Sequence, residues 1–91
     1  MAQNVLRQPP HSLEAEKSVL GAMFISEKAA MTVLSRLKPQ DFYLQRHRDI
    51  FAAVEEIAGT SGPIDLILVL DRLKRAGYSE DEETQYLTDL I

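Results

Sequence analysis

The stretch from Ile64 to Leu70 constrains the fold more than any other part of the sequence. It is apolar at every position except Asp65, so it could form either a buried strand or one face of a helix. Asp65 favours the helix, because its carboxylate is a good N-cap. Ile64 and Val69 then occupy the two positions of a hydrophobic staple around the first turn.

The residues after this stretch also favour a helix. Apolar spacing continues at Leu70 and Leu73, which is the periodicity of a helix face. Gly77 stands where a left-handed C-cap is needed, and Tyr78 is placed to contact Leu73 as in a Schellman motif. The sequence therefore predicts a helix over Leu66–Ala76 and an all-α fold.

Two helices are predicted in the N-terminal half from apolar residues at helical spacing and from the caps beside them. The first begins after Ser12, with Leu13 at the start of its apolar face, and ends near Ile25. The second is capped by Ser26 and cannot continue through Pro39, which lacks the backbone N–H that a helix needs.

Two more helices complete the predicted bundle. The third runs from about Gln45 to Ala58 and is followed by a loop over residues 59–63. The last follows the acidic run Glu80–Glu83 and carries Tyr86, Leu87 and Leu90. Before the third helix, Asp41-Phe42-Tyr43 is predicted to be a turn that inserts both aromatic side chains into the core. The expected architecture is a compact orthogonal bundle of about five short helices.

The length of 91 residues is that of one domain. Residues 1–11 are predicted to be a flexible N-terminal arm, because Pro9-Pro10 cannot nucleate a helix, and residues 12–91 form the helical head. The chain starts without the basic and apolar regions of a signal peptide. Its longest uninterrupted apolar run, Leu66–Leu70, is far shorter than a membrane span. We therefore expect a cytoplasmic protein with no membrane partner.

Catalytic chemistry is not expected within these residues. There is no cysteine, and the four glycines are scattered without the Gly-Lys-Ser/Thr of a phosphate loop. His11 and His47 are 36 residues apart, which is not the spacing of metal ligands. The sequence predicts no catalytic, cofactor-binding or metal-binding residue.

The charge of the chain argues against nucleic acid as the main partner. Acidic residues outnumber basic ones by 14 to 10, which gives a net charge of −4, whereas nucleic-acid binding relies on Lys and Arg at phosphates. The basic clusters are Arg46-His47-Arg48 and the group Arg72, Lys74 and Arg75. Asp49 and Asp71 flank them, so solvated helix faces are the favoured interpretation over phosphate contacts.

Glu16 and His47 are polar residues at positions that should be buried. Glu16 falls in the middle of the apolar face of the first helix, between Leu13 and Leu20. His47 falls on the apolar side of the third helix, one turn before Ile50. Buried polar groups need partners, so these two side chains should satisfy each other or nearby backbone. We predict that they lie close enough to hydrogen-bond, directly or through one water, at the seam between these helices. This interpretation is favoured over a catalytic acid–base pair.

Several stretches together resemble the N-terminal domain of DnaB-type replicative DNA helicases, in that family's order and spacing over residues 9–91. These stretches are Pro9-Pro10-His11-Ser12-Leu13-Glu14-Ala15-Glu16, Ser18-Val19-Leu20-Gly21, Asp41-Phe42-Tyr43, His47 with Ile50-Phe51, and Gly62-Pro63-Ile64-Asp65-Leu66. Two positions depart from the family pattern. Glu83-Thr84 stand where a Gly-Gly pair is usual, and Leu68 stands where a small polar residue is common.

The resemblance implies a non-catalytic assembly and primase-docking domain. In that family the head is followed by a helical hairpin, a linker and a RecA-like motor domain, which binds ATP and Mg²⁺ and hydrolyses ATP. Six chains form a ring that unwinds DNA, and the N-terminal domains form a collar, a trimer of dimers, that docks the C-terminal domain of primase. DNA is then contacted through the parent ring rather than through this head.

The resemblance also suggests where partners would bind. Leu68 lies about 160° around the predicted fourth helix from Leu70, so it cannot join the core face, and Ile67 lies on the flank between. We predict that Leu68 and Ile67 are at least partly exposed in the isolated head and covered in the assembly. The candidate partner interface consists of Asp65, Ile67, Leu68 and Arg72.

Two alternatives remain open at this stage. One is a small helical nucleic-acid-binding module that uses Leu66–Ala76 as a recognition helix. The other is a free-standing interaction protein that mimics the helicase head.

Overall fold

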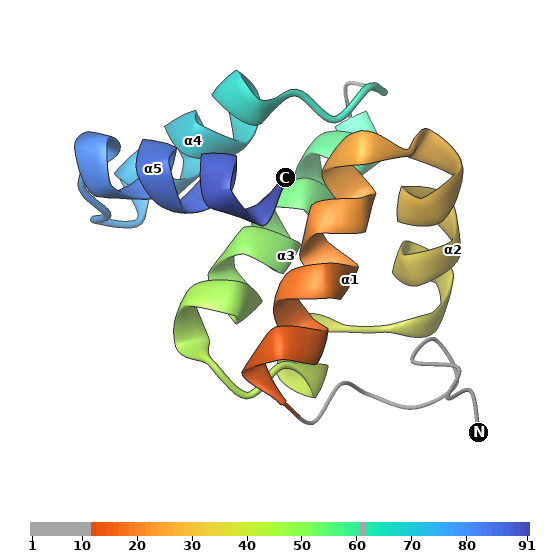
Figure 1. Cartoon of the computed structure of the whole chain (residues 1–91). Coiled ribbons are helices and arrows are strands. Elements are labelled where there is room, and N and C mark those ends of the chain that lie inside the picture. The colour runs from red at the N-terminus through yellow and green to blue at the C-terminus, as the bar shows by residue number, and fades with distance from the viewer. Residues whose placement is uncertain (1–11, 61) are drawn as a thin grey trace.

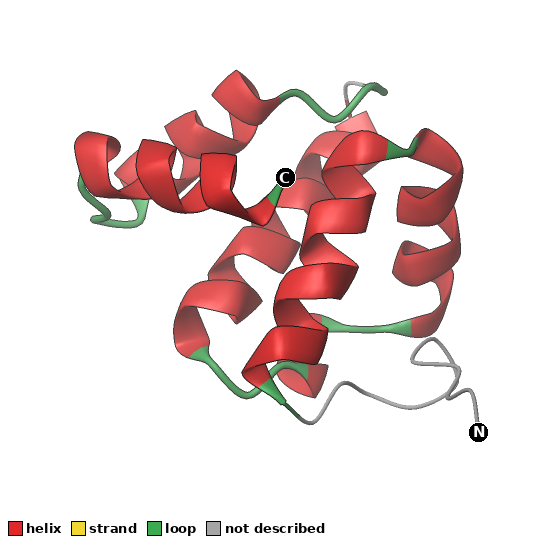
Figure 2. Ribbon diagram, in the orientation of Figure 1, coloured by secondary structure: helices red, strands yellow, loops and turns green. Residues whose placement is uncertain are grey.

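The computed structural model describes residues 12–60 and 62–91, and the predicted arm over residues 1–11 lies outside this range. Within the described residues the protein is all-α, as predicted, with helices joined by short loops (Figure 2). The elements are α1 (Leu13–Ile25), α2 (Glu27–Arg36), the 3-10 helix η1 (Pro39–Asp41), α3 (Gln45–Thr60), α4 (Leu66–Arg75) and α5 (Glu80–Leu90).

The helices form a bundle in which α1 is central. It packs against α2, α3 and α5, while α4 packs against α3 and α5. Figure 1 shows that α5 runs across α1 rather than alongside it, which is the orthogonal arrangement that the sequence predicts. None of the described helices has the length and apolar character that a membrane crossing requires.

Side-chain caps fix the helix starts. The hydroxyls of Ser12 and Ser26 accept hydrogen bonds from backbone amides at 3.0 and 3.1 Å, and the carboxylate of Asp65 accepts one from the Ile67 amide at 2.8 Å. Each cap satisfies a donor that has no partner inside the helix. The predicted start of α4 after Asp65 is therefore confirmed.

A Schellman motif ends α4. The amide of Tyr78 donates to the carbonyl of Leu73, and the amide of Gly77 donates to the carbonyl of Lys74, both at 3.0 Å. Gly77 has a φ of +103°, in the left-handed region that favours glycine. The prediction for this helix end is confirmed.

The core is built from residues of all five α-helices and of the segments beside η1. Phe42 and Phe51 are its largest aromatic members, with ring centroids 5.2 Å apart. Tyr43 is different: it is 80% exposed, so the prediction that both aromatics of the turn enter the core is wrong for this residue. The reason is that Phe42 has extended backbone angles, and successive side chains in extended backbone point to opposite sides.

Two smaller predictions also need correction. Leu13 is 44% exposed, because the buried face of α1 is centred on Glu16, Leu20 and Met23 and the first residue lies at its edge. Helix α3 continues past Ala58 to Thr60. The Thr60 hydroxyl, at the end of this two-residue extension, donates to the Glu56 carbonyl at 3.1 Å.

Helices α1 and α5 approach closely at Gly21. This glycine is buried, and a Cβ placed on it would collide with the backbone carbonyl of Leu90. The close approach therefore depends on the absence of a side chain at this position.

Candidate functional site

Glu16 on α1 and His47 on α3 lie next to each other in the interior. Both side chains are fully buried, and the His47 Nδ1 to Glu16 Oε1 distance is 2.6 Å. A carboxylate can only accept, so His47 donates through Nδ1. The structure thus brings together the two residues that the sequence singles out, at the seam between the first and third helices.

The Glu16–His47 pair belongs to a longer polar chain. The amides of Tyr43 and Leu44 donate to Glu16 at 2.5 and 3.5 Å, and His47 Nε2 lies 2.6 Å from the Tyr86 hydroxyl on α5. Burial raises the pKa of the Tyr86 hydroxyl above its ordinary value, so the hydroxyl keeps its proton and can donate it to Nε2, the ring nitrogen that does not contact Glu16. The chain links α1, the loop before α3, α3 and α5.

A second buried carboxylate, Glu83 on α5, pairs with Arg46 on α3. Arg46 Nε donates to Glu83 Oε1 at 2.9 Å, and the guanidinium carbon lies 4.0 Å from the centroid of the Tyr86 ring, which is a cation–π distance. The hydrogen bond to Glu83 raises the pKa of Arg46, against an opposing effect of desolvation. The other oxygen of Glu83, Oε2, is buried and has no hydrogen-bond partner among the described residues.

This second pair was not predicted from the sequence. A signal for it exists, since Glu83 shares with Tyr86, Leu87 and Leu90 the spacing of one helix face. The same spacing argument identified Glu16. At Glu83 the spacing is harder to recognise, because its neighbours in the run Glu80–Glu83 are also acidic.

Tyr78 makes a further link between helices. Its hydroxyl donates to Asp49 Oδ2 at 2.5 Å, which ties the segment after α4 to α3. Burial, together with this hydrogen bond, raises the pKa of Tyr78 to about 12. Glu16, His47 and Glu83 are closed off from solvent, and their contacts join α1, α3 and α5.

The predicted partner interface divides into two kinds of residue. Ile67 is 73% exposed and Leu68 is 37% exposed, so both are available on the outer side of α4. Asp65 caps α4, and Arg72 donates through Nε to Glu56 on α3 at 2.9 Å, so each already serves the fold. Ile67 and Leu68 are thus the residues of this surface that remain available to a partner. Their role at an interface stays a prediction.

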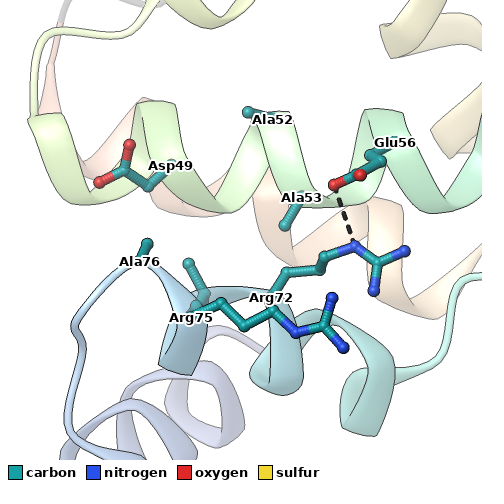
Figure 3. A pocket seen from close by; sticks show the side chains of 8 residues that line it. Asp49, Ala52, Ala53, Glu56, Arg72, Arg75 and Ala76 are labelled. Carbon is teal, nitrogen blue, oxygen red and sulfur yellow. Dashed lines mark hydrogen bonds and ion pairs between the residues drawn. The ribbon is translucent and has the colours of Figure 1, made fainter.

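A shallow groove of about 400 Å³ lies beside this surface, between α3 and α4 (Figure 3). Figure 3 shows the Arg72 side chain crossing to Glu56, with Asp49 further along α3 and alanine side chains between. The lining residues are Asp49, Ala52, Ala53 and Glu56 from α3 and Arg72, Leu73, Arg75 and Ala76 from α4.

The basic clusters are engaged within the protein. Besides Arg46 and Arg72, Arg48 Nε donates to the carbonyl of Phe42 at 2.6 Å, Lys74 lies 3.1 Å from Glu80, and Arg75 lies 3.2 Å from Asp71. A recognition helix needs cations that are free to meet phosphates. Four of these five cations lie beside carboxylates and Arg48 bonds a backbone carbonyl, which disfavours the nucleic-acid-binding alternative.

Comparisons with family models and with known proteins point to the same family. Residues 8–91 match the family described as DnaB-like helicase N terminal domain. Three similar proteins are each named replicative DNA helicase DnaB. The chain is 42% identical to that of Mycobacterium leprae over 71 residues (78% of this chain, 12% of the relative), and 38% identical to that of Rhodothermus marinus over 89 residues (97% and 10%). It is 44% identical to that of Pasteurella multocida over 73 residues (80% and 16%). The chain therefore spans 10–16% of the length of these relatives. No solved structure matches it significantly.

Proposed function

Because the chain belongs to the DnaB-like helicase N-terminal domain family, we propose that it is a non-catalytic assembly and docking domain of a replicative DNA helicase. The parent protein would be a cytoplasmic hexamer whose heads form a collar, with ATP and Mg²⁺ bound in a separate motor domain. The partners of the head would be neighbouring helicase subunits and the C-terminal domain of primase.

The exposed pair Ile67 and Leu68 carries this proposal. Single exposed apolar residues are ordinary, but two neighbours on the first turn of a well-capped helix offer a contact surface of fixed geometry. Ile67 in particular is 73% exposed and contributes little to packing, so substitution at this pair can be separated from folding more readily than at the buried positions of α4. The buried polar chain supports the same interpretation, because it holds the helices in place without presenting reactive groups.

The test is a calorimetric titration of the chain with the primase C-terminal domain of the same organism. The double substitution Ile67→Ser and Leu68→Ser should weaken binding about tenfold or more, which corresponds to about 1.4 kcal/mol, and leave the thermal midpoint nearly unchanged. Met31→Ser is the matched control, because Met31 is an exposed apolar residue on a different helix, α2. Absence of binding by the unmodified chain, or equal binding by both variants, would contradict the proposal.

A further inference from the structure

Helix α5 has the smallest apolar anchor of the described α-helices. Leu87 is its one fully buried apolar side chain, whereas each of the others buries at least two. Tyr86 and Leu90 add partly buried surface beside it. Because burial of apolar surface is the main favourable term in folding, packing holds α5 to the bundle less strongly than it holds the other helices.

The other fully buried side chain of α5 is a carboxylate that is only half satisfied. Glu83 Oε1 accepts hydrogen bonds from Nε and Nη2 of Arg46, the first at 2.9 Å. Glu83 Oε2 is also buried and has no hydrogen-bond partner among the described residues. A buried acceptor without a partner has lost its hydration and gained no hydrogen bond in return. Glu83 therefore favours an arrangement in which water reaches it.

The Arg46–Glu83 pair is unequally buried, which decides how it responds when α5 moves. The Arg46 side chain is 31% exposed, and that of Glu83 is 1% exposed. Taking a carboxylate out of water costs more than an ion pair returns unless its remaining lone pairs also find donors. Release of α5 hydrates both oxygens of Glu83 and leaves Arg46 at the surface, so neither charge is stranded in the interior.

Helices α1–α4 keep most of their own contacts without α5. His47 loses Tyr86 at Nε2, but its Nδ1 still donates to Glu16, which joins α1 to α3. The packing of α1 on α2 and α3, and of α3 on α4, does not involve α5. Among the buried apolar residues of the core, Leu87 is the one that α5 contributes, so the rest of the cluster stays in place.

We propose that α5 opens as a unit while α1–α4 stay folded, and that the Arg46–Glu83 pair sets how easily it opens. Opening uncovers the face of α1 at Gly21, against which the Leu90 carbonyl is packed in the closed form. A partner that binds the open form more tightly than the closed form shifts the head towards it. This opening goes beyond the proposed docking function, because it belongs to the fold whichever surface meets a partner.

Native-state hydrogen exchange of the full chain, followed at single amides by NMR, tests the proposal. The Tyr86 and Leu87 amides on α5 should exchange at least about tenfold faster than those of Phe51 and Val54 on α3, since local opening precedes global unfolding. Low concentrations of guanidinium chloride should accelerate the α3 amides steeply and the α5 amides little, because opening of α5 exposes less surface than global unfolding.

Two substitutions at the pair should act in opposite directions. Glu83→Met should slow exchange of the α5 amides by at least about tenfold, because an apolar side chain replaces a half-satisfied carboxylate and Arg46 can still reach water. Arg46→Met should accelerate exchange of the same amides, since it strands the buried Glu83. Glu82→Met is the matched control, because Glu82 is exposed beside Glu83, and it should change α5 exchange by less than about twofold.

Exchange of the α5 and α3 amides at one common rate in the unmodified chain would overturn the proposal. Faster α5 exchange in the Glu83→Met chain, or failure of that chain to fold, would also overturn it, because the carboxylate would then stabilise the closed form. An equal response to Glu82→Met and Glu83→Met would exclude the buried pair as the element that sets the opening.

Discussion

Glu16→Leu is the substitution that tests most directly how the buried polar chain contributes to stability. Glu16 accepts from His47 Nδ1 and from the amides of Tyr43 and Leu44. Its removal leaves the fully buried His47 N–H without an acceptor, which costs about 1–3 kcal/mol. The two amides are only partly buried and recover some hydration, so they add less.

The replacement leucine offsets part of this loss, because a buried apolar side chain gains about 1.5–3 kcal/mol over an exposed one. The stranded His47 N–H and the two amides that lose their acceptor should together still outweigh this gain. We therefore expect a net loss of about 2 kcal/mol, which lowers the thermal midpoint of a domain of this size by about 8–16 °C.

The assay is urea and thermal unfolding followed by circular dichroism. Glu14→Leu is the matched control, since Glu14 is an exposed carboxylate on the same helix and should change stability by less than about 0.5 kcal/mol. The double variant Glu16→Leu with His47→Leu should cost less than the sum of the single variants, because neither partner is then left alone. Equal stability of the Glu16 and Glu14 variants would refute the reasoning.

Three other predictions concern different parts of the chain. Gly21→Ala should destabilise the fold by about 1–3 kcal/mol despite the better helix propensity of alanine, because the Cβ collides with the Leu90 carbonyl. Gly59→Ala, with nothing within 4 Å of the new Cβ, should instead be neutral or stabilising in the same unfolding assay. Tyr78 has a pKa raised from 10.0 to about 12, so its contribution to stability is present below pH 10 and is lost as the pH rises towards 12. Tyr78→Phe should flatten that alkaline decline, measured as the urea midpoint from pH 9 to 12; an unchanged decline would exclude Tyr78 as its source. The purified chain should neither bind nor hydrolyse ATP, since the sequence contains no phosphate loop, and turnover that copurifies with the chain through two unrelated columns would disprove this.

The features that the sequence predicted are mostly local. Caps at Ser12, Ser26 and Asp65 and the Schellman motif at Gly77 depend on residues within one turn of each other, so short-range chemistry determines them. The proximity of Glu16 and His47 is a longer-range prediction. It could be made because a polar residue on each of two apolar faces needs a partner.

What the sequence could not predict depends on how the helices are placed relative to one another. The approach of Tyr86 to His47 and the pairing of Arg46 with Glu83 join α3 to α5 across 37 or more residues. Several cations look exposed from the sequence, and no local sequence pattern specifies the carboxylate with which each one pairs. The direction of the Tyr43 side chain depends on the backbone angles of its neighbour Phe42. Amino-acid propensities do not predict these angles.

The polar chain through Glu16 also restricts how this sequence can diverge. A buried carboxylate that serves an imidazole and two backbone amides cannot be exchanged alone, since each single change leaves a donor stranded in the interior. The backbone amides cannot mutate at all, so they continue to require an acceptor whatever happens at position 47. Mutational paths away from Glu16 therefore pass through poorly folded intermediates unless Glu16, His47 and Tyr86 change together, and related sequences should keep or lose the three as a set.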